Sequence, residues 1–134
     1  MNPRAELILQ VQSYSDTAIV VTHTRMLAKK LGFSENNQFL VATVASELAT
    51  NLVRYAGGGE IALREIDQDH RSGLQVVARD QGPGIADLDQ AMRDHFSTGN
   101  GLGLGLSSIK RIMDEFIIDT APGRGTLITV RKWK

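Results

Sequence analysis

The sequence predicts an α+β domain in which one mixed β-sheet carries its helices on a single face. The chain has 134 residues, which suits one hydrophobic core, and we expect residues 1–134 to form one domain. Its hydrophobic content of 42% is that of a globular protein. Segments with strand and helix patterns follow one another in the order β-α-α-β-β-loop-α-β-β, which favours two packed layers.

The first half of the chain predicts one strand and two helices. They are a strand at residues 6–12, a helix from Ser15 or Asp16 to about Leu31, and a helix over residues 34–56. Gly32 and Gly57 follow the two helices, and glycine is the residue most often found just past a helix C-terminus. These signals set the helix boundaries.

The second half predicts two strand pairs with a helix between them. They are a hairpin of residues 60–66 and 74–80, a short helical piece at about 88–95, a helix from about 104 to 115, and strands at 116–120 and 126–133. The stretch from Gly82 to Gly105 has glycines at both ends. We expect it to contain a mobile flap.

Composition argues against several classes of partner. Fifteen basic and fifteen acidic residues leave a formal charge of zero, whereas a nucleic-acid surface needs a basic excess. The same balance argues against an electrostatic membrane anchor. There are no cysteines, so there is neither a disulfide framework nor a thiolate metal site. With no long apolar run either, we expect a cytoplasmic protein that binds no nucleic acid and no membrane.

Two polar side chains interrupt the apolar face of the second helix. At about 100° per residue, Leu40, Val44 and Leu48 fall on one apolar arc. Glu47 lies at the edge of that arc, and Asn51 falls inside it. A carboxylate and a carboxamide one turn apart suit a general base beside a ligand for a hard cation. The alternative is an ordinary helix whose polar face begins at Glu47.

A carboxylate ends the strand over residues 74–80. With a period of two, Asp80 shares a face with the core position Ala78. An inward carboxylate at the mouth of a sheet is a good acceptor for a ligand's amino group. The alternative is that Asp80 has left the strand and caps the turn that contains Gly82 and Gly84.

A hydroxyl lies in the equivalent place on the last strand. Thr126 shares a face with Ile128 and Val130, so its side chain is expected to point inward just after Gly125. Threonine is common in strands, and this feature gains meaning only beside Asp80.

A glycine-rich loop, STGNGLGLGL at residues 97–106, precedes a predicted helix. Such loops bind phosphates because bare backbone N–H groups and the helix N-terminus point at the anion. Neither G-x-x-x-x-G-K-[ST] nor G-x-G-x-x-G occurs here. The loop also follows a polar helical segment rather than a strand, so we expect it at the end of the flap.

The order of these motifs along the chain is more informative than any one of them. The sequence presents E-x-x-x-N on a helix, D-x-G-x-G after a strand, G-L-G-L-G-L before a helix and G-T at the start of a strand. This series resembles the ATP-binding domain shared by gyrases, Hsp90, histidine kinases and MutL (GHKL), over roughly residues 34–130. The segments SELATNLVRYAG, RDQGPGI, HFSTGNGLGLGL, SIKRIMDEF and APGRGT resemble the small RsbT-type serine/threonine kinases of bacterial partner switching and the stressosome. The resemblance implies the Bergerat fold, a two-layer α/β sandwich with a mobile ATP lid.

The resemblance also implies roles for the site residues. Asp80 accepts a hydrogen bond from the adenine 6-amino group, supported by Thr126. Glu47 orients and deprotonates the attacking hydroxyl, and Asn51 holds Mg²⁺ against the triphosphate. Arg54 either steadies charge or forms a structural salt bridge. Backbone contacts with ATP are implied at Gly82, Gly84, Gly101, Leu102, Gly103, Leu104, Gly105 and Leu106.

The implied activity is that of an ATP- and Mg²⁺-dependent protein serine/threonine kinase. Its implied partners are a STAS-domain antagonist, RsbS-like or an RsbR-like scaffold, and a downstream regulator such as a PP2C-type phosphatase, which it activates on release. One alternative is an anti-sigma factor kinase of the SpoIIAB or RsbW kind, which sequesters a sigma factor. Another is a binding module in which nucleotide only holds a conformation. Glu47 argues against that reading, because a nucleotide sensor needs no base.

Overall fold

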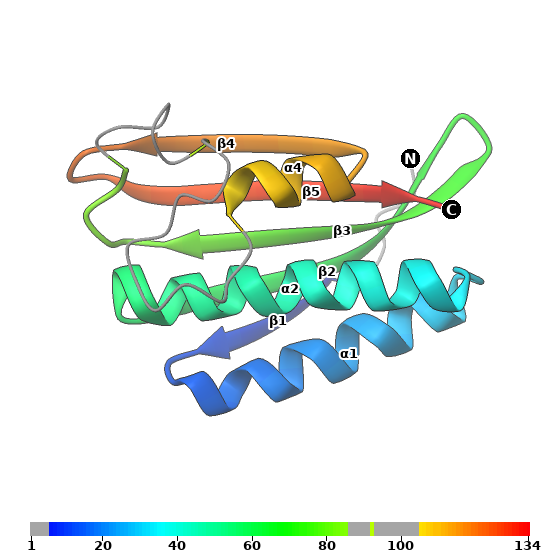
Figure 1. Ribbon diagram of the computed structural model, residues 1–134, viewed down its shortest axis with the longest axis horizontal. Helices are drawn as coiled ribbons and strands as arrows, with labels where there is room; N and C mark the ends of the chain where they lie inside the picture. The colour runs from blue at the N-terminus through cyan, green and yellow to red at the C-terminus, as the bar shows by residue number, and fades with distance from the viewer. Residues whose placement is uncertain (1–5, 86–91, 93–104) are drawn as a thin grey trace.

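The computed structural model describes residues 6–85, 92 and 105–134, which form a five-stranded sheet with helices on one face (Figure 1). The predicted α+β class and the single helical layer are confirmed. In chain order the elements are β1 (Glu6–Val11), the 3-10 helix η1 (Tyr14–Asp16), α1 (Thr17–Lys30), α2 (Glu35–Ala56), β2 (Gly59–Gln68), β3 (Arg71–Asp80), α4 (Leu106–Ile112), β4 (Glu115–Ala121) and β5 (Gly125–Trp133).

The sheet differs from expectation in one respect. Its strand order is β1-β2-β3-β5-β4, and each of the four neighbouring pairs is antiparallel. The expectation of a mixed sheet was therefore wrong. The last hairpin turns its second strand inward, so that β5 lies beside β3 and β4 takes the edge. β4 runs in the same direction as β3, but β5 separates the two.

The core lies between the helices and one face of the sheet. Residues paired across neighbouring strands share a face, and two such rows are buried: Ile61, Ala78 and Ile128 in one, Leu63, Val76 and Val130 in the other. Helix α2 contacts α1 on one side and strands β2 and β3 on the other. In Figure 1, α1, α2 and α4 all lie in front of the sheet.

Capping residues explain where α2 begins and ends. The Ser34 hydroxyl accepts a hydrogen bond from the Asn37 N–H at 3.1 Å, which satisfies one free donor of the first turn. At the other end Gly57 adopts the left-handed conformation, and the Gly58 N–H donates to the Leu52 carbonyl at 2.9 Å. The sequence-based bounds of this helix are confirmed to within one residue.

Helix α4 is shorter than predicted. It ends at Ile112 rather than near residue 115, because Glu115 already pairs with Arg131 in the sheet. The Lys132 ammonium donates to the Ile112 carbonyl at 2.7 Å and so satisfies an acceptor at the helix end. The predicted short helix at 88–95, except for Met92, and the expected lid lie outside the described residues.

Within the described parts of the chain, no helix combines the length and apolar character needed to cross a membrane.

Candidate functional site

The Asp80 carboxylate is held by backbone donors from two different segments. Its Oδ1 atom accepts hydrogen bonds from the Gly82 N–H at 2.8 Å and from the Thr126 N–H at 3.2 Å. Asp80 is still part of β3, where it pairs with Thr126, and it also caps the following turn. The predicted strand position of Asp80 is therefore confirmed, and it caps the turn without having left the strand, as the alternative required. Its role toward a ligand stays a prediction. Among the described residues Oδ2 has no hydrogen-bond partner, so one oxygen of this half-buried group is left for a ligand.

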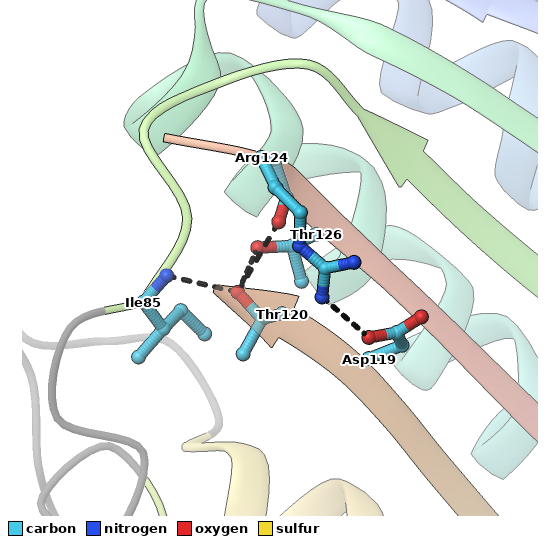
Figure 2. A network of polar contacts seen from close by, with 6 residues as sticks. Ile85, Asp119, Thr120, Arg124 and Thr126 are labelled. Carbon is cyan, nitrogen blue, oxygen red and sulfur yellow. Dashed lines mark hydrogen bonds and ion pairs between the residues drawn. The ribbon is translucent and has the colours of Figure 1, made fainter. Parts of the chain in front are cut away.

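Thr126, which pairs with Asp80 across the β3–β5 ladder, also belongs to a cluster of hydroxyl and backbone groups, shown in Figure 2. Thr126 pairs across the β4–β5 hairpin with Thr120, and their hydroxyl oxygens lie 2.8 Å apart. The Thr120 hydroxyl also accepts a hydrogen bond from the Ile85 N–H at 2.9 Å. Thr120, Thr126 and Asp80 thus form one polar row at the end of the helix-facing side of the sheet, continuing the apolar rows of the core.

The loop after β3 packs against the turn between β4 and β5. The Gly123 N–H donates to the Pro83 carbonyl at 2.8 Å. Gly84 has a φ of +75°, and a Cβ placed on it would collide with the Ala121 carbonyl. Glycine is required at 84 by this contact between two backbone segments. The glycine therefore serves the protein's own fold, whatever it also permits toward a ligand.

The end of β3 also touches the end of α2. A Cβ on Gly82 would lie 2.7 Å from the Ala56 Cβ in the last turn of α2, closer than real Cβ contacts. Asn51 and Glu47 precede Ala56 by five and nine residues, or about 7.5 and 13.5 Å along the helix axis. The absence of a side chain at 82 brings the two halves of the predicted site together.

The apolar face of α2 is placed slightly differently from the prediction. Val44 and Leu48 are buried as expected, but Ala45 and Ala49 are buried with them, whereas Leu40 is only half-buried. The buried arc is thus shifted toward the alanines. Asn51 consequently lies at the margin of the arc rather than inside it, and both it and Glu47 are half-buried.

Arg54 lies among aromatic groups one turn beyond Asn51. Its Cζ atom is 5.7 Å from the centre of the Tyr55 ring. A side-chain hydrogen bond with Tyr55 is the main reason that the pKa of Arg54 is raised, and Tyr14 and the charge of Glu47 add to it. The sequence reading considered neither tyrosine. Tyr14 comes from η1, far away in the sequence, so no local pattern connects it with α2.

Two residues of the glycine loop are described. Gly105 immediately precedes α4, and Leu106 begins the helix and is buried against the core. The other four loop residues of the predicted site lie outside the described residues: Gly101, Leu102, Gly103 and Leu104.

Thr120 was not predicted as a site residue from the sequence. The five-residue connection between Thr120 and Thr126 nevertheless indicates a hairpin that pairs the two.

A two-layer fold with an inward carboxylate at the sheet end and an E-x-x-x-N helix beside it defines a GHKL-type ATP-binding domain. The chain belongs to the family of histidine kinase-, DNA gyrase B- and HSP90-like ATPases, which matches residues 36–134. It is 46% identical over 109 residues to the serine/threonine-protein kinase RsbT of Bacillus subtilis (strain 168), covering 81% of this chain and 82% of that protein. Within the family it is a protein serine/threonine kinase of the RsbT type.

More distant relatives and solved structures are similar in sequence or in fold. An anti-sigma F factor of Caldanaerobacter subterraneus subsp. tengcongensis is 31% identical over 99 residues, 69% of this chain and 68% of that protein. A chain of the SiaB–SiaC complex from Pseudomonas aeruginosa has the same fold, with a TM-score of 0.56 at 14% identity, covering 96% and 89% of the two chains. The catalytic domain of histidine kinase ThkA gives 0.52 at 17% identity, covering 98% and 95%.

Proposed function

We propose that this kinase transfers the γ-phosphate of ATP to a serine or threonine of a STAS-domain antagonist protein. Once released from that partner, it binds and activates a downstream regulator such as a PP2C-type phosphatase. The proposal is supported by the similarity to RsbT and by the partner-binding names of the more distant relatives. It places the chain in the cytoplasm.

Asp80 and Thr126 select the adenine base. The free Oδ2 of Asp80 accepts a hydrogen bond from the 6-amino group, and Thr126 supports that contact directly or through one water. Guanine presents an oxygen at this position, so that two acceptors would face each other. A buried polar mismatch of this kind lowers affinity strongly. The backbones of Gly82 and Gly84 lie next to the nucleotide.

Asn51 is the residue best suited to hold Mg²⁺. Its carboxamide oxygen is a hard donor, its side chain is half-buried at the edge of α2, and no described residue hydrogen-bonds it. Mg²⁺ at such sites takes one or two protein ligands and completes its shell with phosphate oxygens and water. An ion held there by Asn51 would neutralise charge on the phosphates.

Glu47 acts as the base toward the acceptor hydroxyl. The hydroxyl oxygen forms a bond to the γ-phosphorus while the bond from that phosphorus to the bridging oxygen breaks, and ADP leaves with the electron pair. Glu47 receives the hydroxyl proton. Backbone contacts of residues 101–106 with the phosphates stay a prediction, since only Gly105 and Leu106 of this loop lie among the described residues. Glu47 lies on the same helix as Asn51, one turn earlier, so base and metal ligand share one rigid support.

The observation that carries this proposal is the contact of Gly82 with Ala56. It joins the end of β3, where Asp80 offers an acceptor, to the end of α2, which carries Asn51 and Glu47. The acceptor for adenine, the metal ligand and the proton acceptor thereby come from two elements that contact each other.

The direct test is a time course with labelled ATP, Mg²⁺ and a purified STAS-domain protein from a neighbouring gene. We expect one serine or threonine of that protein to become phosphorylated, with little transfer from GTP. A control protein with that residue changed to alanine should stay unlabelled. Absence of transfer to any STAS-domain candidate, with ATP binding intact, would overturn the proposed substrate.

The similarity to anti-sigma F factors supports a second candidate function, that of an anti-sigma factor kinase. The two functions differ in the released partner. A pull-down with purified sigma factor and purified PP2C-type phosphatase separates them, and we expect capture of the phosphatase. Capture of the sigma factor alone would make the chain an anti-sigma factor kinase.

A further inference from the structure

We propose that Thr120 is a positioning residue that sets the direction of the Thr126 hydroxyl and thereby sharpens the selectivity for adenine. The inference rests on the proposed function, in which Asp80 and Thr126 face the base. Thr120 itself does not reach the base in this scheme. It acts through Thr126.

The Thr120 hydroxyl has three neighbours and only one proton. The Ile85 N–H, 2.9 Å away, can only donate to it. The Gly125 carbonyl, 3.3 Å away, can only accept from it. The third neighbour is the Thr126 hydroxyl at 2.8 Å, where either oxygen could be the donor. The direction of the whole network therefore depends on where the Thr120 proton goes.

Distance decides between the two acceptors. Hydrogen bonds between an O–H and an oxygen have a usual length of about 2.7–2.8 Å and rarely exceed 3.0 Å. The contact with Thr126 has this length, whereas the one with Gly125 is beyond it. We assign the Thr120 proton to the Thr126 oxygen; in the opposite assignment Thr126 would donate to Thr120, and Thr120 to the Gly125 carbonyl. In our assignment Thr126 is an acceptor toward Thr120, and its own proton is available to a ligand.

This direction matches the edge of adenine and opposes that of a 6-oxopurine. Adenine offers a donor at its 6-amino group and an acceptor at N1. Asp80 Oδ2 accepts from the first, and the Thr126 hydroxyl donates to the second, directly or through one water. Hypoxanthine and guanine reverse both groups. The bond from Thr120 takes one of the two lone pairs of the Thr126 oxygen and polarises its O–H toward donation, so Thr126 becomes a poorer acceptor for their N1–H.

The test is a titration of Thr120→Val with three Mg²⁺–nucleotides: ATP, purine riboside triphosphate, which lacks the 6-amino group, and inosine triphosphate. Valine keeps the branched shape and removes the hydroxyl. We expect affinity for the first two to fall about 3- to 10-fold, the range of one neutral hydrogen bond. Inosine triphosphate should bind as before or more tightly, and Thr120→Ser should restore the wild-type ratios.

Controls separate this role from loss of structure. Thr129→Val makes the same change on the opposite face of β5, where Thr129 pairs with Val77 and Ile117, and it should leave all three affinities unchanged. If Thr120→Val does not fold, Thr120→Ala removes the hydroxyl without adding a methyl group. Equal weakening of all three nucleotides, or unchanged ratios, would overturn the proposal.

Asp80→Asn in the same titration distinguishes the two levels of inference. If it weakens ATP but barely affects purine riboside triphosphate, the adenine site stands, and Thr120 is judged by its own ratios. If it leaves ATP affinity unchanged in a folded protein, the adenine site itself is wrong, and the role of Thr120 falls with it.

Discussion

The two ends of the β3–β5 ladder are both polar, but they use their polar groups differently. At the end near Trp133, the indole N–H donates to Glu115 at 2.7 Å, and Arg131 donates to Glu115 at 3.1 Å and to Gln75 at 2.8 Å. The Arg71 guanidinium lies 4.7 Å above the Trp133 ring. At the end near Asp80, one carboxylate oxygen has no hydrogen-bond partner among the described residues, and in our assignment one hydroxyl proton is also available.

We interpret this difference in terms of the proposed function: the Trp133 end stabilises the fold, and the Asp80 end is the one proposed to bind the nucleotide. A buried polar group without a partner costs stability, so proteins rarely leave one at a site with no function. The Trp133 end satisfies its groups with other side chains and with the backbone. The Asp80 end satisfies only enough of them to hold the carboxylate in place. The predictions below change one end at a time.

The largest expected effect is on transfer, from Glu47→Ala. Loss of a positioned base slows phosphate transfer about 10²- to 10⁴-fold, while Mg²⁺–ATP and the partner protein still bind. A smaller loss of rate is also consistent with Glu47 as the base, because a loose phosphoryl-transfer transition state demands less of the base. The measurement pairs a labelled-ATP time course with a binding titration.

Asn51→Ala is the matched control one turn away on the same helix face. It should reduce both transfer and the Mg²⁺ dependence of ATP binding. Transfer at the wild-type rate by Glu47→Ala would remove the base assignment, and loss of ATP binding in it would make Glu47 a metal-shell or structural residue.

The next effect is on ATP affinity, from Asp80→Asn, which we expect to fall about 10- to 100-fold. The Oδ1 position receives two backbone N–H groups, so the amide oxygen of asparagine must take that place. Its NH₂ group then faces the ligand, donor against donor. Calorimetric titration with ATP measures the loss, with thermal unfolding as the check on folding.

At the opposite end Glu115→Ala should change stability and not nucleotide affinity. It leaves the Trp133 indole and Arg131 without this partner, and we expect a loss of about 1–3 kcal/mol in the free energy of unfolding. Urea unfolding measures the loss, and ATP titration below the transition measures binding. A fall in ATP affinity comparable to that of Asp80→Asn would contradict the division between the two ends.

The smallest effect is expected at Asp16, a half-buried carboxylate that, like Asp80, accepts two backbone N–H groups on one oxygen. Its Oδ2 accepts the N–H groups of Gln12 and Ser13 at 2.8 and 3.1 Å, and these bonds lower the pKa of Asp16 from its ordinary 3.8. A lowered pKa means that the stabilisation is present above 3.8 and is lost as the pH falls through the folded-state pKa.

Asp16→Asn is therefore the control for Asp80→Asn. It should lower the melting temperature slightly at pH 7, and its difference from the unchanged protein should shrink below about pH 3.8. ATP affinity at pH 7 should not move. Loss of ATP affinity in this variant would show that a carboxylate bound to two backbone donors affects binding wherever it lies.

The sequence alone determined the features that depend on neighbours along the chain. The period of two placed Asp80 on the inward side of its strand, and the turn of α2 placed Glu47 and Asn51 on one side of their helix, because these repeats follow from backbone geometry. Ser34 and Gly57 marked the helix ends through local hydrogen bonds. The order of motifs led to the family.

Only the tertiary structure decided what depends on which strands and helices meet. Whether β4 or β5 lies beside β3 decided that the sheet is antiparallel, and pairing with Arg131 drew Glu115 out of the predicted helix. Two sets of contacts join segments up to 35 residues apart: the close approach of Gly82 to Ala56, and the contacts of Thr120 with Ile85 and Thr126. Local conformational preferences do not predict such contacts, because the free energy that selects them comes from packing the whole core.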